Sequence, residues 1–185
     1  MRLSNEKYEE IKNIVADMFV FYGIENVPIN SFDVAAKMGL TIIPYSSLSA
    51  KRREESQRFN EDGYSVETNE GEWIIYYNDL FIDSTRINQT IMHEIGHYIL
   101  GHTKDGEEEE AEARFLAKYA LASPPLIHNL KEKDVDSIMK TFAIGYEAAT
   151  IALENYRTWL KYGAYDYTSY ERKIMIQIGV ERLRR

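Results

Sequence analysis

Hydrophobic residues recur at helical spacing near the start of the chain. Over residues 4–22 they stand three or four positions apart, which predicts an amphipathic helix that stops near Gly23. A shorter helix is predicted over residues 31–38, because Pro28-Ile-Asn-Ser31 is typical of a helix start and Gly39 of a helix end. The first forty residues therefore predict two helices.

The pattern then becomes extended. Residues 40–45 are apolar and β-branched, and the proline within this run restricts it to the edge of a sheet. Residues 64–66 and 73–77 predict two further strands, joined around Asn69-Glu-Gly71, which is typical of a hairpin turn. Residues 46–62 are polar and charged, and they predict an exposed loop.

From residue 83 onward the period is helical again. Ser84 is a suitable cap for a helix that ends at Gly101. After an acidic loop, a helix over residues 113–121 is predicted to stop at Pro124-Pro125. The last predicted helices cover residues 133–142, 146–161 and 168–183. Helices, then strands, then many helices indicate an α+β fold rather than an alternating α/β fold.

Composition narrows the class of protein. The chain has 185 residues, of which 44% are hydrophobic and 28% charged, as in globular proteins. We expect a core over residues 1–125 and a helical C-terminal region over residues 126–185 packed on it. The 22 basic and 30 acidic residues give a net charge of -8, which disfavours direct nucleic-acid binding. Because the sequence has no cysteine, disulfides, cysteine nucleophiles and Cys-type zinc fingers are excluded.

The beginning of the sequence bears on localisation. The first residues are charged and lack the apolar core of a signal peptide. The longest apolar stretch nearby, residues 14–23, contains Asp17 and is too short to cross a bilayer. These features predict a cytoplasmic protein with no membrane segment.

Candidate chemistry is concentrated in His93-Glu94-Ile95-Gly96-His97, which matches H-E-x-x-H. Residues four apart share a helix face, so both imidazoles project together and suit a tetrahedral Zn²⁺. Glu94, on the flank of that face, can take the proton of a zinc-activated water. The motif predicts His93 and His97 as zinc ligands and Glu94 as the general base of a hydrolase. The alternative, a histidine pair that only packs, is disfavoured by the apolar character of this helix.

A catalytic zinc ion normally has a third protein ligand. His102 lies five residues after His97, whereas the third histidine of the longer H-E-x-x-H-x-x-G-x-x-H motif lies six residues after the second. We therefore expect His102 to end the helix, where the helix dipole favours it, rather than to bind the metal. We also expect His93 and His97 each to donate the other ring nitrogen to a carbonyl or carboxylate oxygen.

A glutamate on the next helix is the other candidate for the third ligand. The buried face of that helix is defined by Ala113, Leu116, Ala117, Ala120 and Leu121. At roughly 100° per residue, Glu109 and Glu110 fall within about 50° of the centre of this face, and Glu112 about 110° away. Glu109 and Glu110 thus remain candidates, whereas Glu107, Glu108 and Glu112 are interpreted as a solvated helix start.

Longer segments around the motif are similar to those of one known family. They are residues 28–39, 73–79, 86–102 and 110–125. Together they resemble the ImmA/IrrE metallo-endopeptidases, in which a pattern Glu-x-Glu-Ala-(Asn/Asp)-x-Phe-Ala carries the third ligand. The resemblance implies that this ligand is Glu110. The chain departs from the pattern at Arg114, where Asn or Asp is usual, and at Leu116, where Phe is usual.

The resemblance also implies a fold and a function. The fold would be zincin-like, with a small β-sheet, an H-E-x-x-H helix, a third-ligand helix and a helical C-terminal part. The activity would be that of a cytoplasmic zinc endopeptidase from a phage or another mobile element. Its substrate would be a helix-turn-helix repressor encoded beside it, so that cleavage acts as an antirepressor step and switches on transcription.

Three questions stay open from the sequence. The two helices predicted within residues 134–159 could form a helix-turn-helix, which makes a DNA-binding or protein-binding regulator with a vestigial metal site the alternative. Their basic and acidic residues nearly cancel, which disfavours DNA contact. A divalent metal other than zinc also suits a His₂Glu set. Tyr76 or Tyr77 could stabilise an oxyanion, and strand alternation lets only one of them point inward.

Overall fold

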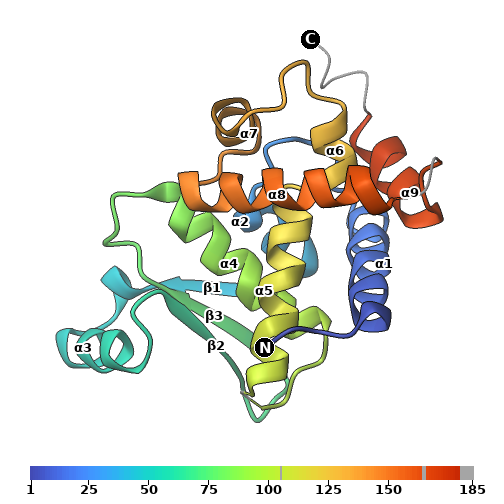
Figure 1. Cartoon of the computed structure of the whole chain (residues 1–185). Coiled ribbons are helices and arrows are strands. Elements are labelled where there is room, and N and C mark those ends of the chain that lie inside the picture. The colour runs from blue at the N-terminus through green and yellow to red at the C-terminus, as the bar shows by residue number, and fades with distance from the viewer. Residues whose placement is uncertain (105, 164–165, 180–185) are drawn as a thin grey trace.

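The computed structural model describes residues 1–104, 106–163 and 166–179, and it confirms the α+β class (Figure 1). One sheet has the strands β1 (Thr41–Pro44), β2 (Gly63–Glu67) and β3 (Trp73–Tyr77) in the order β1-β3-β2. β1 runs parallel to β3, and β2 pairs with β3 as an antiparallel hairpin. The edge position of β1 and the hairpin are both as the sequence predicts.

Helices make up most of the rest of the structure. Their bounds are α1 Asn5–Phe21, α2 Ser31–Met38, α3 Ala50–Phe59, α4 Ser84–Ile99, α5 Glu107–Leu121, α6 Pro124–His128, α7 Val135–Phe142, α8 Tyr146–Tyr162 and α9 Ser169–Ile178, with a 3-10 turn η1 at Tyr45–Ser47. α1 begins at Ser4, whose side chain accepts a hydrogen bond from the amide of Lys7, and α2 ends at Gly39 with φ 73°. Both early helices therefore lie where their pattern and caps predict them.

The sheet and the helices meet at α4. Ile75 of β3 is completely buried, and α4 packs against β2, β3 and α5. α4 and α5 lie side by side in the centre of Figure 1. The contact is closest at Gly96, where an added Cβ would lie 3.2 Å from both the Cα and the carbonyl oxygen of Ala113. Glycine at this position lets the two helix backbones approach.

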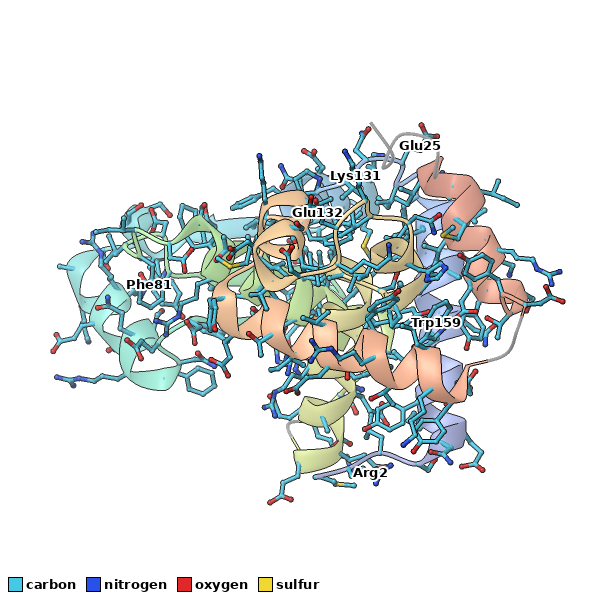
Figure 2. All side chains as sticks on the ribbon, turned by 45° about the horizontal axis from the view of Figure 1, so that its top comes forward. Arg2, Glu25, Phe81, Lys131, Glu132 and Trp159 are labelled. Carbon is cyan, nitrogen blue, oxygen red and sulfur yellow. The ribbon has the colours of Figure 1, made fainter. Side chains whose placement is uncertain are left out.

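The C-terminal helices pack on the rest of the molecule. α9 lies along α1, where Lys173 pairs with Asp17 at 2.6 Å and the Tyr170 hydroxyl donates to Glu9 at 2.7 Å. The indole of Trp159, labelled on α8 in Figure 2, donates to Glu171 of α9 at 2.6 Å. α9 is thereby held against α1 and α8.

The expected loop over residues 46–62 is wrong, because it contains η1 and α3. α3 stands at the far side of the sheet, away from the helical body (Figures 1 and 2). Its residues are polar because nearly all of them face solvent, and Ser56 is its one buried residue. Ser49 caps its start, and the pair Glu54–Arg58 adds the i,i+4 ion-pair support that an exposed helix uses.

Helix boundaries differ from the prediction in two further places. Asp83, not Ser84, caps α4, since its carboxylate accepts from the amide of Thr85 at 2.9 Å. Pro124 and Pro125 do not only stop α5 but also begin α6, where proline is tolerated in the first turn. Residues 180–183 of the last predicted helix lie outside the described residues. Within the described parts of the chain, no helix is both long and apolar enough to cross a membrane.

The close contact at Gly96 generates a prediction. Overpacking a core contact costs about 1–3 kcal/mol of unfolding free energy, which lowers the melting temperature by roughly 2–4 °C per kcal/mol in a chain of this size. We expect Gly96→Val to melt several degrees below the wild-type protein, measured by thermal denaturation without metal. Gly96→Ala should lie between them, because the helix preference of alanine offsets part of the clash.

Gly145→Ala is the matched control for this series. An added Cβ at Gly145 meets only the Thr85 hydroxyl, at 3.4 Å, and its φ of -68° suits any residue. We expect this variant to melt close to the wild-type temperature. If Gly96→Val melts with the wild type, the two helices are not held at their closest approach by this glycine.

Candidate metal centre

The H-E-x-x-H residues lie in the second half of α4, on the side that faces α5 and the sheet. Glu94 and His97 are buried, and His93 is partly exposed. The helix places His93 and His97 one turn apart, with their Nε2 atoms separated by 3.1 Å. The local periodicity of α4 therefore brings these two nitrogens together, as the motif predicts.

Glu110 joins the two histidines from the first turn of α5. One of its carboxylate oxygens lies 3.4 Å from His93 Nε2, and the other lies 3.3 Å from His97 Nε2. Among the described residues, His93, His97 and Glu110 form a group whose ligand atoms all lie within 4.8 Å of one another. The neighbouring Glu109 instead pairs with Lys104 at 3.3 Å, and Glu107 and Glu108 are exposed.

The three side chains of this group, the metal triangle, are close enough together to share a metal ion. Two ligand atoms of a regular tetrahedron are about 1.6 bond lengths apart, so bonds of about 2.0–2.1 Å to nitrogen and oxygen place them about 3.3–3.4 Å apart. The 3.1 Å between the two Nε2 atoms lies close to that value, and the Nε2 atoms lie 3.4 and 3.3 Å from different oxygens of Glu110. With a single Glu110 oxygen as the ligand atom, the three ligand atoms lie within 4.8 Å of one another. Two imidazoles and one carboxylate are also the donor set of His₂Glu catalytic zinc sites. The residues present therefore fit a bound divalent metal.

The charge of Glu110 suits this role. The hydrogen bond from His93, followed by the charges of the two histidines and Arg114, lowers the pKa of Glu110 to about 2, despite opposing desolvation. Arg114 contributes weakly, because its guanidinium is 3.8 Å from the carboxylate and largely exposed. Glu110 is therefore an ionised carboxylate, the form that coordinates a cation.

Glu94 points to the sheet rather than to α5. The Ser65 hydroxyl on β2 donates a hydrogen bond of 2.6 Å to Glu94 Oε2. Ser65 pairs with Ile75 across the hairpin, so its side chain is on the face of the sheet that α4 covers. A buried carboxylate beside the two histidines is thus oriented by a strand residue. The sequence pattern marked Ser65 only as part of a strand, and no local signal identifies it as a partner of Glu94.

His102 and Glu112 differ from their expected positions. His102 lies outside the metal triangle, with its Nδ1 3.0 Å from His97 Nδ1 and its Nε2 3.1 Å from Glu112 Oε2. The interpretation of Glu112 as solvated is wrong, since only 10% of its side chain is exposed. α5 has a second covered side, where Lys7 of α1 lies 3.6 Å from Glu112. His97 Nδ1 therefore contacts the imidazole of His102, where we expected a carbonyl or carboxylate oxygen. That His93 donates its other ring nitrogen to such an oxygen stays a prediction.

The two candidate oxyanion tyrosines are on opposite faces of β3. Tyr76 stacks on Tyr64 of β2, with ring centroids 5.1 Å apart. Tyr77 is on the same face as the buried Ile75 and packs edge-on against Phe32 of α2 at 5.4 Å. Tyr77 is therefore the tyrosine that points inward, and burial raises its pKa above the ordinary value.

One cavity is separate from the triangle. It has a volume of about 600 Å³ and lies among α1, α5, α8 and α9, with Tyr8, Phe115 and Trp159 in its wall. The described residues that line it do not include His93, His97 or Glu110. The chemistry suggested by the motif is thus located on the α4–α5 face and not in this cavity.

Comparison with known protein families gives one match. The Peptidase_M78 family model, described as the IrrE N-terminal-like domain, matches residues 42–154. The matched region begins at the second residue of β1 and ends in α8, so it includes β2, β3 and all residues of the triangle. Curated proteins gave no match.

The triangle predicts that Glu110 is needed to hold a metal. We expect Glu110→Gln to lower zinc affinity by more than the roughly 10–100-fold caused by loss of an outer hydrogen-bond partner. Zinc affinity is measured by competition with a chromogenic chelator. Glu108→Gln on the exposed side of the same turn is the control and should bind zinc like the wild type. If Glu110→Gln binds zinc with wild-type affinity, Glu110 is not the third ligand, and Glu109 is the next candidate.

Proposed function

The chain belongs to the Peptidase_M78 family of ImmA/IrrE-type metallopeptidases, and on this premise we propose that it is a zinc-dependent endopeptidase that cleaves a helix-turn-helix repressor. The observation that carries the proposal is the group of His93, His97 and Glu110, whose ligand atoms lie within 4.8 Å of one another and form a His₂Glu donor set. We assign these three residues as the zinc ligands and Glu94 as the general base.

The metal would be held between α4 and α5 by two neutral imidazoles and one carboxylate. When bound, zinc supplies Lewis-acid chemistry, because it polarises a peptide carbonyl and makes water a stronger acid. The choice of zinc is supported by the donor set, since two imidazole nitrogens and one carboxylate oxygen are the ligands of His₂Glu zinc sites. Glu110 would coordinate the ion as an ionised carboxylate.

Glu94 carries the proton transfer in this proposal. It is next to His93 in the chain, and its carboxylate is buried at the edge of the α4 face toward β2. Its carboxylate takes a proton from the attacking water and returns it to the amide nitrogen as the peptide bond breaks. The Ser65 hydroxyl donates to Oε2 and so orients the carboxylate that takes the proton.

The substrate is the finer part of the proposal. A peptidase acts on a protein, and the similarity to ImmA/IrrE endopeptidases supports a repressor encoded beside this chain. A regulator with a vestigial metal site is the alternative. In that case the α7–α8 pair would bind DNA or a partner protein, and the residues at the triangle would have no role in its activity.

Glu94 separates a catalyst from a protein that only binds metal. Glu94→Gln keeps the size and shape of the side chain but removes the base, so we expect wild-type zinc content with at least ~10²-fold slower cleavage. Zinc is measured by metal analysis and cleavage by following the repressor over time. Glu108→Gln should cleave at the wild-type rate. Unchanged proteolysis by zinc-loaded Glu94→Gln protein would contradict the assigned base.

The substrate is tested separately by co-expression. We expect the helix-turn-helix protein encoded beside this chain to be cut when produced with the wild type and to stay intact with Glu94→Gln. An intact repressor together with Glu94-dependent cleavage of another protein would reject the repressor and leave the endopeptidase standing. DNA binding that weakens steeply with salt would instead favour the regulatory alternative.

A further inference from the structure

We propose that His102 and Glu112 are positioning residues that fix the orientation and tautomer of His97. The inference rests on the proposed role of His97 as a metal ligand. It starts from a row of contacts behind that residue: His97 Nδ1 to His102 Nδ1 at 3.0 Å, His102 Nε2 to Glu112 Oε2 at 3.1 Å, and Glu112 Oε1 to Lys7 Nζ at 3.6 Å. The row links α4 to α5 and α1.

The turn after α4 places His102 in this row. Gly101 has φ 69°, and its amide donates to the carbonyl of Tyr98 at 3.1 Å. The amide of His102 then donates to the carbonyl of His97 at 3.0 Å. These two bonds define a Schellman motif around the C-cap residue Leu100. The motif turns the chain back so that His102 lies next to His97. The spacing of five residues, which argued against His102 as a metal ligand, is the spacing that places its ring edge-on against that of His97, with centroids 5.0 Å apart.

The two rings can share only one hydrogen atom between their Nδ1 atoms. His97 Nε2 faces the metal triangle and must present a lone pair there, so the neutral ring carries its hydrogen on Nδ1. His97 therefore donates to His102, whose Nδ1 must accept. A neutral His102 with a free Nδ1 lone pair carries its hydrogen on Nε2 and donates it to Glu112. The hydrogen bonds of the row therefore all run the same way, from His97 to His102 and from His102 to Glu112.

Burial gives this row its effect. The exposed fractions of the side chains are 8% for His97, 8% for His102 and 10% for Glu112. Water has little access to replace a lost partner, and an unpaired ring nitrogen would be left in a desolvated site. The carboxylate at the end of the row is balanced by Lys7, whose pKa is raised by Glu10 first and also by Glu112. His97 is thus held through an imidazole by a buried, charge-balanced carboxylate.

The consequence is that affinity for metal depends on two residues that do not touch it. An outer partner that orients a metal-binding imidazole typically accounts for about 10–100-fold in metal affinity. We expect His102→Leu to bind zinc about 10–100-fold more weakly than wild type. His102→Asn should recover part of this loss, because its side-chain oxygen can accept from His97 Nδ1 near the place of the lost nitrogen.

His128→Leu is the matched control. His128 also hydrogen-bonds a neighbour, with Nδ1 3.1 Å from the Tyr156 hydroxyl, but it lies on α6 beside α8. Its substitution should leave zinc affinity unchanged. A role of His102 in general stability alone predicts that His102→Asn and His102→Leu lose zinc affinity equally. A positioning role predicts the rescue.

A double-mutant cycle tests whether Glu112 acts through His102. Glu112→Leu should weaken zinc binding in the wild-type background and have no further effect on affinity in His102→Leu. Additive losses would show that Glu112 acts independently and would overturn the row.

The tautomers are tested without any variant. Long-range nitrogen–proton correlation spectra of the zinc-loaded wild type should show His97 protonated on Nδ1 and His102 protonated on Nε2. A proton on His102 Nδ1 would overturn the inference, as would wild-type zinc affinity in His102→Leu. A wild-type protein that fails to bind zinc would instead reject the proposed metal site itself, so the two failures are distinguishable.

Discussion

The contact between α4 and α5 at Gly96 and Ala113 is the constraint on which the site depends. A side chain at Gly96 would meet the backbone of Ala113 at 3.2 Å, so the helices come this close only because glycine is there. Glu110 stands one turn before Ala113, and this separation brings its short carboxylate to both histidines. Gly96 is one of the two unspecified positions of the H-E-x-x-H motif. In this fold its lack of a side chain lets α5, which carries Glu110, approach α4 closely.

Around that contact, each reactive group is supported from a different element. Ser65 on β2 orients Glu94, and the carboxylate of Glu110 comes from α5. His102, from the turn after α4, lies between His97 and Glu112. Because Ser65 is on β2 and both Glu110 and Glu112 are on α5, the geometry is fixed only when the sheet and α5 are docked on α4. Zinc binding and folding should accordingly be coupled.

The departure at Arg114 has a modest structural effect. Arg114 is one turn after Glu110 on α5, and its guanidinium lies 3.8 Å from that carboxylate with 59% of the side chain exposed. An exposed ion pair of this length is worth little. The buried partners are instead His102 and Glu112, which lie behind His97. The sequence pattern had placed Glu112 in a solvated, acidic helix start.

Local structure was largely determined by the sequence itself. Helix periodicity, the caps at Ser4 and Gly39 and the turn at Gly71 depend on neighbours within a few residues, so α1, α2 and the hairpin follow from the pattern. The relation between His93 and His97 is local too, because one helical turn separates them. The choice of Glu110 needed the helix face together with the family resemblance, since periodicity alone left Glu109 open.

Tertiary structure decided the rest. α5 is covered on two sides, by α4 and by α1. The single hydrophobic stripe in its sequence indicates only one covered side. Glu112 lies on the other covered side and was therefore interpreted wrongly as solvated. Ser65 meets Glu94 only because β2 pairs with β3 under α4, and α3 is a helix although it buries almost nothing. A sequence pattern records how much apolar surface a segment hides. It does not record which polar side chain from a distant segment will arrive beside a buried one, because that depends on how the elements dock.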